Sequence, residues 1–191
     1  MDLETVRHEE SEGIGVALDE DRDLGHWGVV VTLEKRHEGI NDFPDMTREE
    51  FLARFEPYEV LEMEGNILVT AGINLMLDLL IGAGGTVYSN ANAFIGVGDG
   101  NGSVPTPAQG DTDLTAPTNK LRKAMNATYP QRGTRQCTWQ SDFGTSDANF
   151  AWREWGVFNA SSAGTMLNHK GVDMGTKVSG TWTLTVTISI S

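Results

Sequence analysis

Cysteine and histidine are both scarce in this sequence. The single cysteine, Cys137, excludes a disulfide within the chain and leaves its redox compartment undetermined. Its side chain is expected to lie in the core, on the same strand face as Trp139. The four histidines have no metal-ligand spacing, and Cys137 has no thiol partner. We therefore expect no metal site and no cofactor.

Long hydrophobic runs are also absent. The longest apolar stretch, residues 67–81, is interrupted by Gly72, Asn74 and Asp78, and it is shorter than the ~20 residues that a bilayer requires. The amino terminus has neither a basic region nor an apolar run, which predicts that no secretory signal is present. We therefore expect a soluble protein that does not bind a membrane.

Basic residues are outnumbered by acidic ones only in the first third of the chain, and this third carries all of the net charge. Residues 1–64 contain 19 Asp and Glu against 6 Lys and Arg, whereas residues 65–191 contain 8 of each. The net charge of −13 argues against nucleic acid as a direct partner. Residues 1–25 have few large apolar side chains, so their own contacts cannot offset the entropy lost on ordering. We predict an acidic arm there, either a flexible tail or a segment that orders on a neighbouring surface.

A small strand–helix–strand element is expected over residues 26–66. Residues 27–33 are rich in valine, which is typical of a strand. Residues 47–50, Thr-Arg-Glu-Glu, have the spacing of a capping box and predict a short helix over residues 48–55. Residues 58–63 alternate apolar with acidic side chains, which indicates a half-exposed strand.

Residues 68–81 have the strongest helical pattern in the chain. Apolar side chains recur at helical spacing, and few polar residues interrupt them. A helix this apolar is expected to be covered on most sides, by the rest of the protein or by another subunit. We expect Val69, Ile73, Met76 and Leu80 to take part in such a contact.

The clearest strand lies near the carboxyl end. Residues 181–190 alternate strictly between large apolar side chains and Thr or Ser, which predicts one buried and one solvated face. Other short strands, separated by turns rich in Gly, Asn and Ser, are typical of a sandwich. We predict a mainly β protein, an antiparallel β-sandwich with one or two short helices and an extended acidic N-terminal arm. Its body is expected over residues 67–191, beginning with the helix.

No catalytic site is evident. The chain lacks the Gly-x-Ser-x-Gly motif that holds the nucleophilic serine of many serine hydrolases. Glu154, between Trp152 and Trp155, is the one acid of the body with apolar neighbours. It is either a catalytic acid with a raised pKa or, in the interpretation we favour, the carboxylate of a buried ion pair with Arg or Lys. We therefore predict no catalytic residue and no enzyme activity.

A basic cluster stands out in the body. It consists of Lys120, Arg122 and Lys123, with Arg132 and Arg135 nearby. The cluster either binds phosphate or docks an acidic segment, from the same chain or from a neighbour, and we favour docking.

These features together predict a protein that acts through interfaces. The acidic arm, the apolar helix and the basic cluster each supply a means of association. The candidate interface residues are Asp19, Glu20, Asp21, Asp23, Val69, Ile73, Met76, Leu80, Lys120, Arg122 and Lys123.

About two-thirds of the chain resembles a known family. The blocks that carry the resemblance include GNILVTAGIN at residues 65–74, NANAFIGVGD at residues 90–99 and ANFAWREW at residues 148–155. They resemble small virion structural proteins, head decoration or tail-associated, of tailed double-stranded DNA phages. The pair His169-Lys170 departs from the family pattern, in which an arginine-containing pair is more usual.

The resemblance implies a non-enzymatic component of the virion. We expect a capsid decoration or cement protein present in many copies, whose partners are copies of itself and the major capsid or tail proteins. A tail, neck or fibre-attachment protein is the first alternative. A carbohydrate-binding module used in host attachment is another, because the five tryptophans could form a sugar-stacking platform if they are not core residues. A glycosidase is the last.

Overall fold

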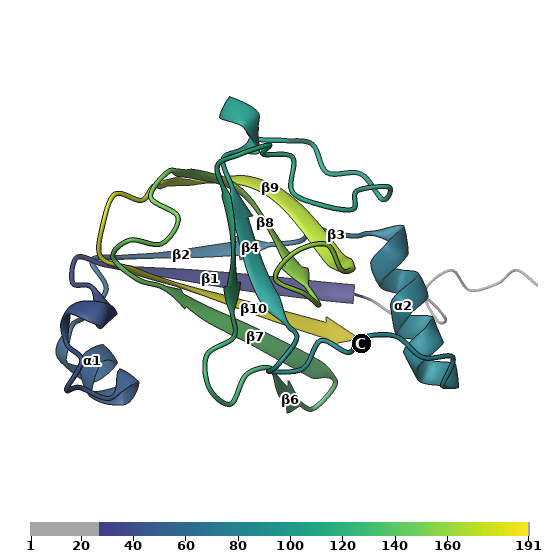
Figure 1. Ribbon diagram of the computed structural model, residues 1–191, viewed down its shortest axis with the longest axis horizontal. Coiled ribbons are helices and arrows are strands. Elements are labelled where there is room, and N and C mark those ends of the chain that lie inside the picture. The colour runs from purple at the N-terminus through teal and green to yellow at the C-terminus, as the bar shows by residue number, and fades with distance from the viewer. Residues whose placement is uncertain (1–26, 191) are drawn as a thin grey trace, which may run out of the picture.

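Two five-stranded antiparallel sheets form the protein, whose computed structural model describes residues 27–190 (Figure 1). The strand order is β2-β1-β10-β7-β6 in the first sheet and β3-β9-β8-β4-β5 in the second. The elements are β1 (Trp27–Arg36), η1 (Ile40–Asp42), α1 (Arg48–Arg54), β2 (Glu59–Glu64), β3 (Ile67–Leu68), α2 (Thr70–Ile81), β4 (Phe94–Gly98), η2 (Gly100–Gly102), β5 (Lys120–Ala124), β6 (Gln131–Gly133), β7 (Gln136–Phe143), β8 (Ala151–Phe158), β9 (Met166–Thr176) and β10 (Thr181–Ile190).

The predicted fold class is confirmed. The chain is mainly β, the sheets are antiparallel and two short α-helices accompany them. The predicted acidic arm, including Asp19, Glu20, Asp21 and Asp23, lies outside the described residues, so it stays a prediction.

The boundary expected at residue 66 does not separate two structural units. β1 lies between β2 and β10, and it pairs with β10 along ten residues, from Trp27 opposite Ile190 to Arg36 opposite Thr181. The element expected over residues 26–66 therefore supplies two strands of the first sheet. The reason is burial: β1 places Val31 in the core, fully buried, and this strand cannot form a stable unit with β2 alone.

The core lies between the two sheets. β10 contributes the predicted apolar face, and Val29, Val31 and Leu33 extend it along β1. The opposite sheet contributes Ile95 and Val97, together with large side chains that include Trp152, Trp155 and Val157. Side chains from both sheets interdigitate in one continuous cluster, as expected for a sandwich.

The second face of β10 is less solvated than the sequence predicts. Thr183 is buried on this face, and its hydroxyl donates a hydrogen bond of 2.7 Å to the carboxylate of Asp142 on β7. Arg48 at the start of α1 pairs with the same carboxylate and covers it. The alternating pattern therefore identifies the strand correctly but does not reveal that a helix covers part of its polar face.

The two α-helices lie at opposite ends of the sandwich (Figure 1). α1 begins at the predicted capping box, in which Thr47 and Glu50 exchange both hydrogen bonds. α2 ends at Gly82, whose backbone is left-handed with φ of 73°, a conformation that glycine adopts without a steric penalty.

Candidate functional site

A buried acid–base cluster lies on the outer side of the second sheet. Glu154 on β8 and His169 on β9 are both fully buried, and the Oε2 atom of Glu154 is 2.9 Å from Nε2 of His169. The Nδ1 atom of the same ring is 2.6 Å from Oδ2 of Asp111. The imidazole therefore bridges two carboxylates, one from the sheet and one from the loop formed by residues 103–119.

The same cluster fastens this loop to the sheet. The backbone N–H groups of Thr115 and Ala116 each donate a hydrogen bond of 2.8 Å to the Glu154 carboxylate. Leu114, between these anchors, packs against Phe158 on β8. These three polar contacts and one apolar contact help to hold the loop on the sheet, although it contains no helix or strand of its own.

The pKa values of the cluster follow from these contacts. Burial by itself would raise the pKa of Glu154, but the hydrogen bonds from His169, Thr115 and Ala116 outweigh it and hold that pKa below its ordinary value. Burial would lower the pKa of His169, but its contacts with Glu154 and Asp111 outweigh burial and raise that pKa. Glu154 and His169 therefore form a buried ion pair.

The favoured sequence interpretation of Glu154 was right about the ion pair and wrong about its partner. The partner is His169, which is neither Arg nor Lys. The alternative, a catalytic acid, requires a raised pKa and access to substrate, whereas the pKa of Glu154 is lowered and its side chain is sealed beneath the loop. The geometry suits a structural clamp. Nothing in the spacing of residues 111, 154 and 169 could have revealed it.

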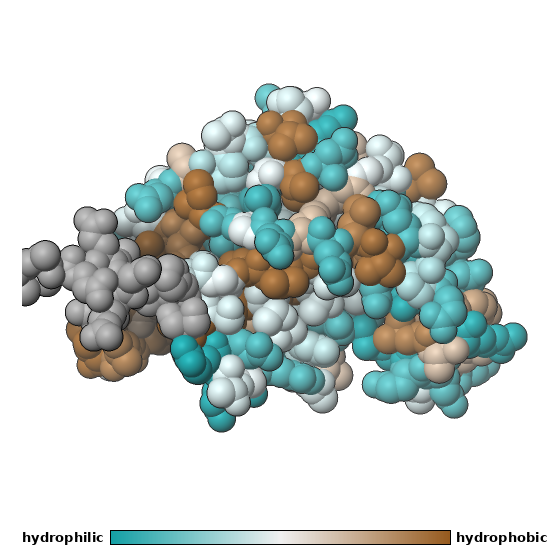
Figure 2. All heavy atoms as spheres, turned by 180° about the vertical axis from the view of Figure 1, so that it is seen from behind, coloured by the Kyte–Doolittle hydropathy of each residue, from teal (hydrophilic) through white to brown (hydrophobic). Residues whose placement is uncertain are grey.

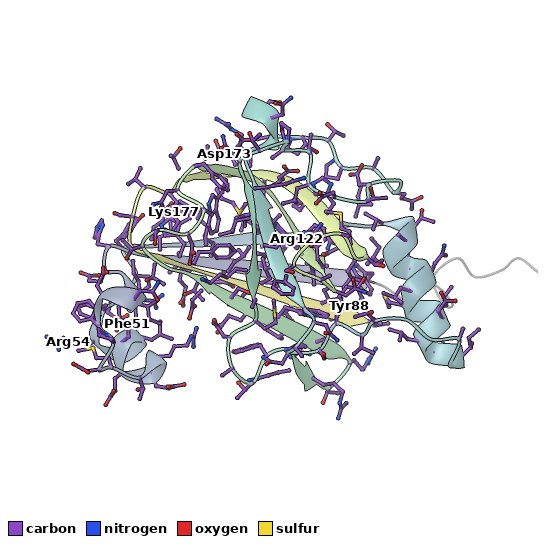
Figure 3. All side chains as sticks on the ribbon, in the orientation of Figure 1. Phe51, Arg54, Tyr88, Arg122, Asp173 and Lys177 are labelled. Atoms are coloured by element: carbon purple, nitrogen blue, oxygen red, sulfur yellow. The ribbon has the colours of Figure 1, made fainter. Side chains whose placement is uncertain are left out.

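Two carboxylates of the body pair with the three cations of the predicted basic cluster and neutralise most of their charge. The ammonium of Lys120 and the guanidinium of Arg122 lie 2.6 and 2.8 Å from the Asp113 carboxylate. Lys123 lies 2.6 Å from Asp147. Arg122, on the edge strand β5 (Figure 3), also stacks 3.5 Å from the ring centroid of Phe158. Docking of an acidic segment on these three cations would have to compete with the pairs inside the body, and it stays a prediction.

The predicted apolar face of α2 is only partly available. Val69 is fully buried at the start of the helix, Met76 packs against the core and Ile73 is half-buried. Leu80 is 80% exposed, and the neighbouring Ile81 is 77% exposed. The exposed apolar face is therefore displaced around the helix from the predicted one.

Gly72 explains how α2 is rotated about its own axis relative to β9. A Cβ atom at Gly72 would lie 2.5 Å from the backbone oxygen of Leu167 on β9, so only glycine allows the helix to approach this strand so closely. The contact directs Leu75 inward, where it is buried, and leaves Leu77, Leu80 and Ile81 facing outward. We call these three residues the α2 face. Figure 2 shows hydrophobic side chains gathered at this end of the molecule.

A cavity of about 570 Å³ opens beside α2, and the sequence does not predict it. Its walls come from both sheets, from α2 and from Tyr88, which lies toward the α2 end (Figure 3). The buried indole Nε1 of Trp139, a lining residue, has no hydrogen-bond partner among the described residues. The cavity is lined by Trp27, Met76, Tyr88, Arg132, Gly133, Arg135, Gln136, Cys137, Trp139, Leu167, Ile188 and Ile190.

Four of the five tryptophans are core residues. Trp139, Trp152, Trp155 and Trp182 are each at least 94% buried, and Trp27 is half-buried at the cavity. They therefore offer no exposed platform for stacking against sugars. Within residues 27–190, no group of His, Cys, Asp or Glu side chains is placed to hold a metal ion. In the same range, no helix is long and apolar enough to cross a membrane.

No family model matches the sequence, and comparisons with curated proteins and with solved structures find no significant match.

Proposed function

We propose that this chain is a non-enzymatic structural protein of the virion of a tailed phage-like virus, namely a capsid decoration protein that assembles in many copies. Its partners would be copies of itself and the major capsid or tail proteins. The proposal rests on the family resemblance of the sequence and on surfaces of the sandwich that suit association.

The α2 face is the observation that carries the proposal. Leu77, Leu80 and Ile81 are 54%, 80% and 77% exposed on a helix of only 12 residues. Burying a side chain of this size stabilises a complex by about 1.5–3 kcal/mol. A permanent interface buries upward of ~2,000 Å² in total, so this face would be the centre of a larger contact.

The rest of the molecule supports a role in association over one in chemistry. The buried cluster of Glu154 and His169 is sealed from solvent, and its hydrogen-bonding atoms are engaged by Asp111 and by backbone amides. A tail, neck or fibre-attachment protein would use the same face and remains the alternative location. The carbohydrate-binding alternative loses most of its support because four of the five tryptophans are buried.

The experiment compares a variant of the α2 face with a matched surface variant. Leu80→Asp combined with Ile81→Asp places two charges on the face without disturbing the core. Val178→Asp alters a valine that is 75% exposed between β9 and β10, far along the chain from α2. Each protein is measured by analytical ultracentrifugation and by its occupancy in particles purified from infected cells.

We expect the wild-type protein and Val178→Asp to associate and to enter particles, and the double variant to remain monomeric and to be depleted from particles. Circular dichroism establishes that all three proteins are folded. Absence of the wild-type protein from particles would refute the virion proposal. Equal occupancy of the three proteins would instead refute the assignment of the α2 face.

A further inference from the structure

Arg132 and Arg135, the two arginines near the basic cluster, have no carboxylate partner in the described part of the chain. Lys120, Arg122 and Lys123 are paired with Asp113 and Asp147. The guanidinium of Arg132 donates only to the backbone oxygen of Gly133, and that of Arg135 only to the backbone oxygen of Ile190. Both arginines line the cavity beside α2, so this apolar cavity has a positively charged rim.

The cavity walls are suited to aliphatic side chains. Most of the lining residues are aromatic or aliphatic, and the volume of about 570 Å³ exceeds that of a single side chain and falls within the range of ligand pockets, about 300–1,000 Å³. The unpartnered Nε1 of Trp139 could donate a hydrogen bond to a backbone carbonyl of an inserted segment, which would satisfy a buried donor.

The acidic arm, residues 1–25, contains a segment that combines aliphatic and acidic side chains and so matches the apolar walls and positively charged rim of the cavity. Ile14, Val16 and Leu18 alternate with small residues, and the acidic cluster of residues 19–23 follows at once. In an extended chain, alternate residues share one face, so the three aliphatic side chains can enter one cavity together. The acidic residues lie between them and Trp27, which is both the first described residue and a wall of the cavity.

We propose that residues 14–23 of the same chain occupy this cavity, with the three aliphatic side chains inside it and the acidic cluster against Arg132 and Arg135. The site thus binds an internal acidic–apolar peptide. This role goes beyond the proposed function and holds whether or not the protein is part of a virion.

Chain length favours the segment of the same molecule over that of a second copy. Leu18 precedes Trp27 by nine residues, and an extended chain of this length spans up to ~30 Å, enough to turn back into a cavity at whose wall it starts. A short flexible tether gives an effective concentration on the order of 1 mM. A second copy at micromolar concentration cannot compete with it.

The single cysteine provides the test, because Cys137 lines the cavity and no other thiol is present. The rate of Cys137 alkylation by iodoacetamide is measured for the folded full-length protein at fixed pH. One variant carries Ile14→Asp, Val16→Asp and Leu18→Asp. The matched control carries Leu3→Asp, Thr5→Asp and Val6→Asp, which add the same number of negative charges outside the proposed segment. A second pair carries Arg132→Glu with Arg135→Glu, alone and combined with the triple variant.

We expect alkylation to be about tenfold faster in the triple variant than in the wild type, as a segment docked about 90% of the time implies, and unchanged in the control. The arginine substitutions should accelerate alkylation in the wild-type background and have little effect in the triple variant, because both remove the same contact. Equal rates in the wild type and the triple variant would overturn the proposal. Protection that disappears on dilution would also overturn it, since the occupant would then belong to a second copy. Added decanoate should slow Cys137 alkylation only in the triple variant. If it slows alkylation equally in the wild type and the triple variant, the cavity of the wild type is vacant and binds a small amphipathic ligand, which would likewise overturn the proposal.

Discussion

The imidazole of His169 lies 2.9 Å from the carboxylate of Glu154, and both side chains are fully buried. The two residues are adjacent in space only because β8 and β9 pair in the second sheet. Breaking a buried ion pair by removing one partner leaves an uncompensated charge in the interior, which costs about 3–5 kcal/mol. This pair therefore contributes to the pH dependence of the stability of the protein.

The stabilisation from this pair should be greatest between pH 4.5 and pH 6.5, the ordinary pKa values of Glu154 and His169. The pKa of His169 is raised on folding, so its contribution is complete below pH 6.5 and is lost as the pH rises through the raised value. The pKa of Glu154 is lowered, so its contribution is complete above pH 4.5 and is lost as the pH falls. Urea unfolding of the wild type and of His169→Gln, measured from well below pH 4.5 to well above pH 6.5, gives the contribution of the pair as a difference. A difference that does not change with pH would contradict the ion pair.

Gly72→Ala should destabilise the protein by about 1–3 kcal/mol, because the new methyl group would overlap the backbone of Leu167. Asn74→Ala, on the exposed side of the same helix, is the control and should change the free energy of unfolding by less than about 0.5 kcal/mol. Thermal unfolding followed by circular dichroism compares the two. If both substitutions have the same small effect, the close approach of α2 to β9 is incorrect.

Phe51→Ala should melt α1 locally and leave the sandwich folded. Phe51 is fully buried in an aromatic cluster with Phe43 and Phe55, and its removal should cost about 3–5 kcal/mol. Hydrogen exchange is expected to accelerate over Arg48–Arg54 and to stay slow in β10. Arg54→Ala, an exposed position on the same helix (Figure 3), should leave exchange in α1 nearly unchanged. Global unfolding of Phe51→Ala would show that α1 is integral to the sandwich.

Replacing Asp113 and Asp147 by Asn should expose the basic cluster that they neutralise. The wild-type protein is expected to pass a heparin column unretained, and the double variant to be retained at low salt and released as salt is added. Asp173→Asn removes an exposed carboxylate elsewhere on β9 (Figure 3) and serves as the matched control. Retention of the wild type and the control to the same degree as the double variant would contradict internal neutralisation.

The sequence predicts elements whose periodicity is strong. The alternation of residues 181–190 identifies β10, and the capping box at Thr47 identifies the start of α1. These signals are local, so they are visible without knowledge of the fold. The place of β1 between β2 and β10 is not local, because it depends on pairing between residues more than 150 positions apart in the chain, such as Val31 with Val186.

The candidate sites were harder to predict for the same reason. The pattern of α2 shows that the helix is apolar almost all round, but the packing of Gly72 on Leu167 decides which side faces outward. The partners of Glu154 come from β9 and from a loop without regular structure. The cavity forms where Trp27, Tyr88 and Trp139 come together at one end of the sandwich. These residues are far apart in the sequence, so no sequence motif predicts the cavity.

The pairing of Trp27 with Ile190 has a practical consequence for labelling and display. A fluorescent protein or affinity handle joined after the last strand emerges next to the point where the first strand starts, at the end that carries α2 (Figure 1). Such a fusion would sterically obstruct both α2 and the opening of the cavity beside it. A handle inserted at the opposite tip, near Val178, would leave them open to solvent.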